Sequence, residues 1–299
     1  MYLIVVSVNI GIFILLALSL NIITGYAGQA ALGHAAFFGI GAYTSAIMTS
    51  NYGFSFWISL PVAFMVSGIV GIGLGLISIR MKDDFLAITT IGVNFVIVAL
   101  FQYSSFFGAS LGMTVKKPMF FGMRMNTSGY LILITIIIII TCYFIHKMNK
   151  SWFGLALSSI RNDEMVASSL GIDVNKYKIL AFSLGTAIAG IAGAVYAHHM
   201  TFIYSSDFAF TVSIGILSMV VIGGIGTIRG PILGAILLGA APELFRFFAD
   251  YRMIVYGGLL VLMMRFQPQG IFGNDSFITR NFIQAYKNIF KKKVGDIIE

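Results

Sequence analysis

Long apolar segments separated by short polar ones make up most of the chain. A helix needs about 20 apolar residues to cross the hydrocarbon core of a bilayer, and the pattern predicts about nine such spans, with a range of eight to ten. The predicted spans are Tyr2–Thr24, Gly25–Met48, Trp57–Ile79, Phe85–Phe107, Gly129–Ile145, Ile179–His199, Phe210–Ile225, Pro231–Phe248 and Met253–Met264. The second, seventh and ninth are short or interrupted by glycine, which is typical of broken or re-entrant helices. We therefore predict an all-α polytopic membrane protein.

The stretch Ser151–Lys178 is the longest before the C-terminal tail that lacks a membrane-length apolar segment. Its middle predicts one short helix, with Asn162 as N-cap, Asp163 and Glu164 in the first turn and Gly171 just after the end. The apolar positions of this helix gather on one side: Met165, Val166 and Leu170. A short capped helix with an apolar face, held between two spans, is expected to rest on a separate protein.

Composition supports the membrane class. The chain is 58% hydrophobic and only 10% charged, whereas a soluble domain carries about 25% charged residues. No Asp, Glu, Lys or Arg occurs from Met1 to Ile79. The apolar N-terminal run has no basic region before it and no small-residue cleavage site after it, so we interpret it as a retained span rather than a cleaved signal peptide. The single cysteine, Cys142, cannot form an internal disulfide.

The distribution of basic residues predicts the orientation. If Ser151–Lys178 is cytoplasmic and there are nine spans, 14 of the 19 Lys and Arg residues fall on the cytoplasmic side. This excess agrees with the positive-inside rule and places the N-terminus outside and the C-terminus inside. The net charge of +8 is thus explained by orientation and lipid headgroups rather than by nucleic acid. We divide the chain into a transmembrane domain, 1–273, and a basic cytoplasmic tail, 274–299.

Two glycine clusters, Gly25–Gly33 and Gly223–Gly230, stand apart from the other glycines. Most of the 33 glycines are explained by close helix packing in lipid. Each cluster, however, surrounds polar residues with helix-weakening ones, which favours a helix break near a translocation path. The path residues that we predict are Gly28, Gln29, Gly33, His34, Gly223, Gly224 and Gly226. Thr24, Thr44 and Asn94 are further polar candidates.

His34 lies within a predicted span, and His198 and His199 lie at the end of another. His34 is either a group that lines the path or a neutral side chain bonded to a neighbouring helix, because no carboxylate accompanies it in the first two spans. His198 and His199 are expected at the membrane interface, and adjacent residues on a helix do not share a face, which argues against a metal site.

Several motifs are absent. The chain contains no GxxxxGK[ST], no HExxH and no CxxC, so it offers no P-loop for ATP. Asp207, Glu243 and Asp250 fall near predicted span ends or in loops, whereas ion-coupled carriers keep an intramembrane carboxylate. A transporter built on this chain must take its energy from a partner. We expect no enzyme, no catalytic residue, no cofactor and no metal in the chain itself.

Four blocks of sequence occur in a specific order. They are NIITGYAGQAALGHAAFFGIGAY (Asn21–Tyr43), GLALSSIRNDEMVASSLGIDVNKYK (154–178), VIGGIGTIRGPILGAILLG (Val221–Gly239) and FQPQGIFG (Phe266–Gly273). Together they resemble the bacterial branched-chain amino acid ABC transporter permeases, the LivM-like subunit. The resemblance covers nearly the whole chain up to Gly273.

The resemblance implies an importer in the bacterial cytoplasmic membrane. Its expected partners are a second homologous permease, two cytoplasmic ABC ATPase subunits that hold the ATP, and an extracytoplasmic substrate-binding protein. The helix Asn162–Leu170 would be the coupling helix, and Glu164, Ala167 and Gly171 match its E-x-x-A-x-x-x-G form. Asp163 completes the predicted ATPase-coupling residues.

The substrate is left open. Where many members have Gly-Gln-x-Ser-Leu-Gly-His, this chain has Ala31 in place of the serine. Related permeases transport other amino acids, urea or amides. A stand-alone secondary carrier or channel remains an alternative, and a membrane enzyme is disfavoured by the lack of clustered His, Asp, Glu or Ser residues.

Overall fold

The computed structural model describes residues 2–78, 83–120, 123–244, 258, 261 and 265, and it is almost entirely helical. The α-helices are α1 (Tyr2–Leu20), α2 (His34–Ser50), α3 (Phe56–Ser78), α4 (Asp83–Tyr103), α5 (Thr127–Asn149), α6 (Trp152–Asn162), α7 (Glu164–Ser169), α8 (Val174–Met200), α9 (Phe210–Gly223) and α10 (Arg229–Leu244). A π-helix, η1 (Asn21–Tyr26), continues α1. Short 3₁₀ turns occupy η2 (Ser105–Phe107), η3 (Ala109–Leu111) and η4 (Ser205–Phe208).

Six helical stretches in the described ranges are long and apolar enough to cross a membrane. They are Tyr2–Tyr26, Phe56–Ile77, Phe85–Tyr103, Thr127–Asn149, Val174–Met200 and Ser205–Gly223. The apolar helix Arg229–Ala240 and the 17-residue α2 are shorter. The protein is therefore an all-α, multi-pass membrane protein, as the hydrophobic pattern predicts. The ninth predicted span and the tail 274–299 lie outside the described residues, apart from isolated positions.

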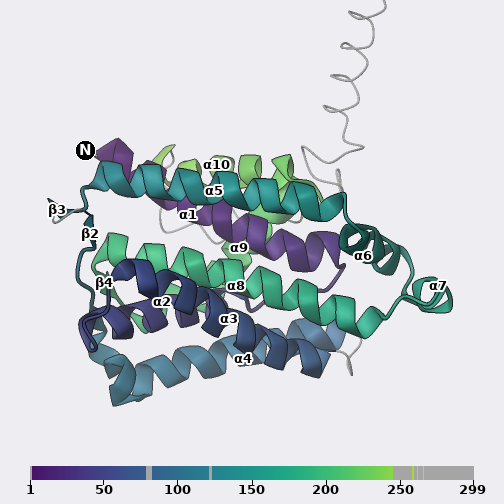
Figure 1. Cartoon of the computed structure of the whole chain (residues 1–299), viewed down its shortest axis with the longest axis horizontal. Coiled ribbons are helices and arrows are strands. Elements are labelled where there is room, and N and C mark those ends of the chain that lie inside the picture. Colours follow the sequence, from purple (N-terminus) through teal and green to yellow (C-terminus); the bar gives the residue numbers. More distant parts are fainter. Residues whose placement is uncertain are drawn as a thin grey trace, which may run out of the picture.

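The long helices lie side by side in one bundle (Figure 1). Helix α8 is central and packs mainly against α3 and α2, and also against α1. The α2–α8 contact is a direct backbone approach: a Cβ on Gly41 would overlap the carbonyl group of Gly190, and one on Gly193 would overlap the Phe38 carbonyl oxygen. Small residues give close packing where the hydrophobic effect between helices is weak.

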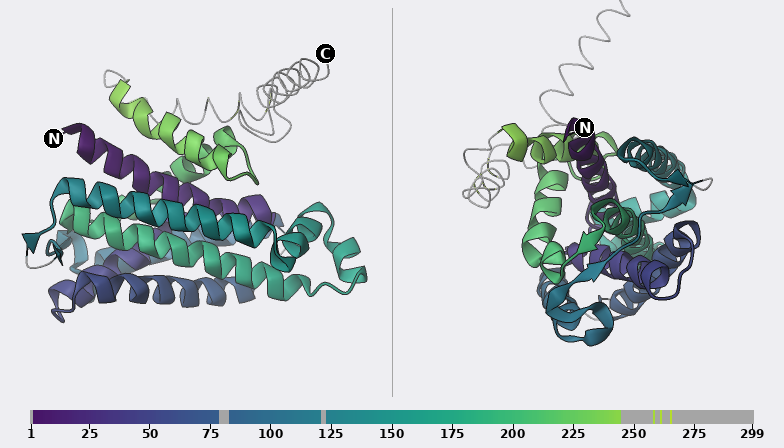
Figure 2. Two further views of the ribbon diagram at one scale, coloured as in Figure 1. Left: turned by 45° about the horizontal axis from the view of Figure 1, so that its top comes forward. Right: turned by 90° about the vertical axis from the view of Figure 1, so that its left-hand side faces the viewer.

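Helices α3, α4 and α5 present apolar side chains outward. Ile69, Phe95 and Ile139 are more than half exposed, while α1 and α8 are largely buried. The end-on view shows the helices grouped around a shared interior (Figure 2). Exposed aliphatic and aromatic side chains on outer helices are what a lipid environment requires.

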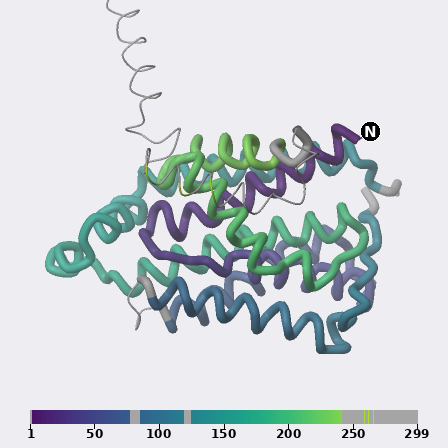
Figure 3. The backbone as a smooth tube through the Cα atoms, turned by 180° about the vertical axis from the view of Figure 1, so that it is seen from behind, coloured from purple at the N-terminus to yellow at the C-terminus, as the bar shows by residue number. Residues whose placement is uncertain are grey.

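Short strands cap one end of the bundle. Strands β1 (Met113–Thr114) and β4 (Phe202–Ile203) pair antiparallel, with Met113 opposite Ile203, and β2 (Met119–Phe120) pairs with β3 (Met123–Arg124). Helices α6 and α7 lie beyond the opposite end (Figure 1). The reverse view shows the teal α6–α7 segment extending beyond one end of the bundle (Figure 3).

The two adjacent histidines, His198 and His199, lie in the last turn of α8, as predicted for a span end. His198 is fully buried within the bundle, where its ring contacts the carbonyl oxygen of Ala194 at 2.9 Å and Thr49 Oγ1 at 3.2 Å. Helix α8 ends at Met200, one residue after the predicted end of this span at His199. His199 is partly buried.

Candidate functional site: the α6–α7 segment and two helix breaks

The segment between α5 and α8 contains two helices where one was predicted. Helix α6 is amphipathic and buries Ala156, Leu157 and Ile160. It includes Asn162 as its last residue, so the prediction of Asn162 as N-cap is wrong. Asp163, with an extended backbone, forms the corner and is the N-cap of α7. A strongly amphipathic α6 that continues through Asn162 shifts the cap by one residue.

Helix α7 is capped at both ends. The Asp163 Oδ1 accepts hydrogen bonds from the backbone N–H groups of Met165 (2.8 Å) and Val166 (3.1 Å). At the other end Gly171 has φ +84°, its N–H donates to the Ser168 carbonyl oxygen, and the Ile172 N–H donates to that of Ala167. This pair of hydrogen bonds is a Schellman motif, in which glycine is favoured because φ is positive. The predicted stop at Gly171 is confirmed.

Helix α7 has one inward contact face and one exposed face. Ala167 is 1% exposed, whereas Met165, Val166 and Leu170 are 80%, 56% and 74% exposed. The predicted apolar face therefore points to the surroundings and leaves only the small Ala167 against the protein. A neighbouring groove of about 390 Å³, lined in part by Trp152, Leu155 and Tyr177, lies between α6 and the start of α8.

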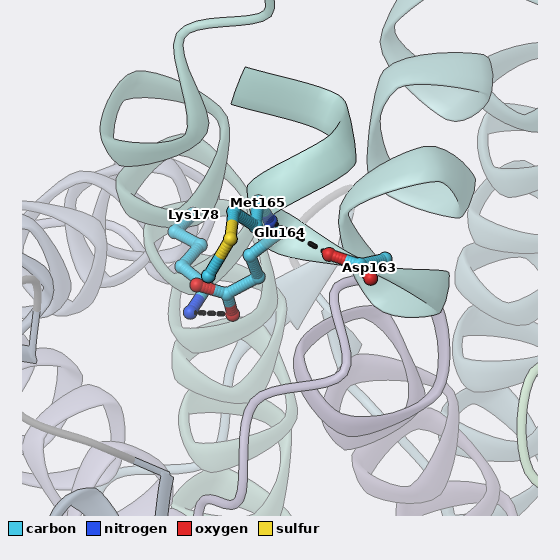
Figure 4. Close-up of polar contacts among 4 residues, drawn as sticks. All are labelled: Asp163, Glu164, Met165 and Lys178. Carbon is cyan, nitrogen blue, oxygen red and sulfur yellow. Dashed lines mark hydrogen bonds and ion pairs between the residues drawn. The ribbon is translucent and has the colours of Figure 1, made fainter. Parts of the chain in front are cut away.

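Glu164 connects α7 to the bundle. Its carboxylate forms an ion pair with Lys178 Nζ on α8 (Figure 4). The Lys178 side chain is largely buried, and that of Glu164 is about half exposed. Pairing a largely buried ammonium with a carboxylate offsets part of the cost of its desolvation. Lys178 was not among the predicted site residues, because sequence spacing does not place it opposite Glu164.

The first predicted helix break is confirmed. After η1 the chain leaves regular structure at 27–33 and resumes as α2 at His34. Gly28 has φ +72°. The Gln29 side chain is 1% exposed, and neither its oxygen nor its nitrogen has a hydrogen-bond partner. Gly33 lies against α4 so closely that a Cβ would overlap the Thr90 carbonyl oxygen.

Polar side chains from three other helices surround the start of α2. His34 Nε2 and Ser19 Oγ on α1 share a hydrogen bond of 2.7 Å. The Leu32 N–H donates to Thr90 Oγ1 on α4 (3.0 Å), and the Ala35 N–H donates to Ser213 Oγ on α9 (2.8 Å). The buried His34 thus makes the neighbouring-helix contact that one of its two interpretations expects. Its role in a path stays a prediction.

The second predicted break is also confirmed. Helix α9 ends at Gly223, Gly224 and Gly226 have φ +126° and +79°, and α10 starts at Arg229. A Cβ on Gly223 would overlap the Gly230 carbonyl oxygen. Thr227 closes the turn: its Oγ1 donates to the Gly224 carbonyl oxygen (3.1 Å) and accepts from the Gly230 N–H (3.0 Å).

The two breaks meet in space. The buried Asn21 side chain donates from Nδ2 to the Thr227 carbonyl oxygen (2.8 Å) and accepts at Oδ1 from the Gly226 N–H (2.8 Å). Arg161 of α6 reaches the same place, where its Nη1 donates to the Gly25 carbonyl oxygen at 2.5 Å. Sequence reasoning missed both Asn21 and Arg161. Asn21 begins one of the quoted blocks, but nothing in the sequence indicates its partner 206 residues away.

A family model described as "Branched-chain amino acid transport system / permease component" matches residues 2–264. The chain belongs to this permease family. The permease is 34% identical over 286 residues to the high-affinity branched-chain amino acid transport system permease protein LivM of Salmonella typhimurium, covering 87% of this chain and 67% of that protein. The Escherichia coli K12 LivM is 33% identical with the same coverage.

A LivH relative also matches. The probable branched-chain amino acid transport permease protein LivH of Methanocaldococcus jannaschii is 26% identical to the permease over 89% of this chain and 90% of its own length. No solved structure gives a significant match to the permease. The described part of the permease contains no group of three or more His, Cys, Asp or Glu residues arranged to hold a metal ion.

Proposed function

We propose that the permease is a transmembrane subunit of an ABC importer that moves branched-chain or related amino acids across the bacterial cytoplasmic membrane. ATP is bound and hydrolysed on two cytoplasmic partner subunits. A second, homologous permease completes the membrane part, and an extracytoplasmic binding protein delivers the substrate. Transport permease relatives named LivM and LivH support the substrate class and the second permease.

The observation that carries the proposal is the exposed apolar face of α7. Met165 and Val166 stand on the six-residue helix α7 and Leu170 is its C-cap, beyond the end of the bundle. Charged residues flank them at Arg161, Asp163, Glu164 and Asp173, which favours a position outside the hydrocarbon core. Clustered apolar side chains with a polar rim, exposed to water, are typical of a protein–protein contact.

Charge supports a cytoplasmic location for this end. Six basic residues of the described ranges lie at the α6–α7 end: Lys147, Lys150, Arg161, Lys176, Lys178 and Arg229. Three lie at the strand end: Lys116, Lys117 and Arg124. The positive-inside rule places the richer end in the cytoplasm, where ATP is available. In the same orientation the C-terminal tail is cytoplasmic.

The first break is where we expect substrate to pass. Leu, Ile and Val are zwitterions with apolar side chains. The N-terminus of α2 carries the positive end of a helix dipole, and discontinuous helices in transporters present such ends to substrate carboxylates. Gln29 adds a buried amide whose donor and acceptor are both unpaired. A path that binds weakly here can release the substrate, while a separate receptor supplies affinity.

The proposal is tested by co-expressing the permease with its proposed partners, a second homologous permease and two ABC ATPase subunits. We expect the ATPases to co-purify with the permease. Glu164→Arg sets a positive charge beside Lys178, and Gly171→Asp adds a negative side chain at the Schellman glycine, so each variant should reduce uptake at least tenfold. Lys147→Ala, an exposed residue on α5, serves as the control.

Membrane insertion of each variant is checked by fluorescence-detected size-exclusion chromatography. Wild-type uptake by both variants would contradict the proposal. Concentration of solute by liposomes that contain this permease alone would instead support a stand-alone carrier, because no partner would then supply energy.

A further inference from the structure

Arg161 lies where α6 turns into α7 and reaches back into the bundle. It is in the last turn of α6, two residues before the Asp163 cap. Its guanidinium Nη1 donates to the carbonyl oxygen of Gly25, 136 residues earlier. This oxygen belongs to the π-helical end of α1, and the chain leaves helical structure at Ala27. The last carbonyl groups of a helix have no further backbone donors, so an arginine is a suitable partner.

Three glycines enclose the Arg161 side chain. The ideal Cβ position of Gly28 lies 3.3 Å from Arg161 Cγ, and that of Gly226 would overlap Nη1. Gly28 and Gly226 both have positive φ. The third glycine, Gly25, supplies the acceptor. One side chain therefore bonds Gly25 at the end of η1 and lies beside Gly28 of the α1–α2 break and Gly226 of the α9–α10 break.

Asn21 completes the connection between the breaks. It bonds Gly226 and Thr227 of the second break, and its Oδ1 fills the space that a Cβ on Gly25 would need. A continuous set of contacts thus runs from the corner before α7 through Arg161 to Gly25, and from Gly25 through Asn21 to Gly226. The Glu164–Lys178 ion pair connects α7 to α8 instead.

We propose that Arg161 transmits displacement of α6–α7 to both helix breaks, and so couples ATP hydrolysis on the partners to movement of the translocation path. This inference rests on the proposed function. Arg161 is a positioning residue, because it touches the path backbone and not the substrate. A guanidinium suits the role because its planar group can bond Gly25 while lying against Gly226, whereas an ammonium makes a single point contact.

The experiment compares four forms of the assembled transporter in liposomes: wild type, Arg161→Ala, Arg161→Lys and Lys150→Ala. Lys150 is exposed at the same end of the bundle, so its variant is a control for loss of one positive charge. Three quantities are measured: co-purified ATPase, the rate of ATP hydrolysis and the rate of leucine uptake. The ratio of leucine transported to ATP hydrolysed reports coupling, which a purely structural or docking role would not change.

For Arg161→Ala we expect ATPase binding and hydrolysis within twofold of wild type and a coupling ratio about tenfold lower. Arg161→Lys should give an intermediate ratio, and Lys150→Ala the wild-type ratio. A wild-type ratio in Arg161→Ala overturns the inference, as does loss of ATPase binding in that variant, which would assign Arg161 to docking. If Arg161→Ala does not insert, Arg161→Lys decides, and a wild-type ratio there overturns the inference.

Failure of the proposed function gives a different result. In that case wild type itself neither binds the ATPases nor accumulates leucine, and the inference falls with it. If wild type is active and the Arg161 variants keep its ratio of leucine transported to ATP hydrolysed, the Arg161 inference is contradicted and the proposed function is not.

Discussion

The break between α1 and α2 runs over residues 27–33, and the break between α9 and α10 over 224–228. The second is closed by its own threonine, since Thr227 Oγ1 bonds both the Gly224 carbonyl oxygen and the Gly230 N–H. The first break takes backbone bonds from Thr90 and Ser213 of other helices, as the second does from Asn21, but it also leaves the buried Gln29 amide unpaired at both its oxygen and its nitrogen. The two breaks are thus unequal in how their polar groups are satisfied.

We expect this difference between a break that only turns the chain and the break where we propose that substrate passes. An unsatisfied buried polar group costs about 1–3 kcal/mol, so proteins seldom keep one without a reason. Residues 223–230 contribute no such side-chain atom, whereas Gln29 contributes two and His34 one. We interpret the second break as a rigid support and the first as the place that retains free polar groups for a passing zwitterion.

Both breaks depend on close approach of two backbone segments, and substitutions that prevent this approach should cause the largest loss of stability. Gly33→Ala and Gly223→Ala each add a methyl group that overlaps a carbonyl oxygen, of Thr90 and Gly230 respectively. Because backbone cannot move aside as a side chain can, we expect losses of about 3 kcal/mol, the upper end for overpacking, and little folded protein in size-exclusion chromatography. Gly92→Ala, which meets nothing within 4 Å, should fold normally. Equal yields of the three variants would contradict the prediction.

Asn21→Ala tests the connection between the two breaks. The substitution leaves the Gly226 N–H and the Thr227 carbonyl oxygen without their side-chain partner, and we expect a loss of about 2 kcal/mol from two such groups. The measurement is the thermal midpoint in detergent. Asn9→Ala is the matched control on the same helix, because Asn9 Oδ1 has no hydrogen-bond partner. A midpoint equal to that of the control would show that the breaks are held together by other contacts.

Gln29→Met tests whether the first break is a site. Methionine is similar in size and removes the two unpaired polar atoms, so the thermal midpoint should stay constant or rise. Leucine uptake per folded molecule should fall about tenfold, equivalent to about 1.4 kcal/mol. The control is Gln102→Met at an exposed position of α4. Wild-type uptake by Gln29→Met would contradict the interpretation that the first break, unlike the second, contacts the substrate.

Thr227→Val should have the smallest effect. In contrast to Gln29→Met, it should lower stability and leave uptake unchanged. It removes two hydrogen bonds that close the second break, at a cost of about 1 kcal/mol, and lowers the thermal midpoint by a few degrees. Uptake per folded molecule should stay at the wild-type level. Thr135→Val, at an exposed position where Oγ1 bonds only its own helix, should change neither quantity. A selective loss of uptake in Thr227→Val would assign the second break to the path as well.

Local features of the sequence predicted much of the fold. The apolar segments predicted α1, α3, α4, α5 and α8, because membrane length and composition are properties of each segment alone. The glycine clusters predicted both breaks, and Gly171 predicted the end of α7, since positive φ is a backbone requirement that glycine meets at low cost. The division of 151–178 into α6 and α7 was not predicted, because Asn162 and Asp163 are both good N-caps.

The sequence by itself determined a multi-pass helical protein of the branched-chain amino acid permease family, with an exposed helix between α5 and α8 and two interrupted helices. Only the tertiary structure decided that the interruptions touch each other, that Asn21 bonds Gly226 and Thr227, and that Arg161 reaches Gly25. The reason is physical. Helix length, caps and breaks follow from neighbouring residues, whereas contacts between positions 136–206 residues apart depend on how closely glycine lets α1, α8, α9 and α10 approach.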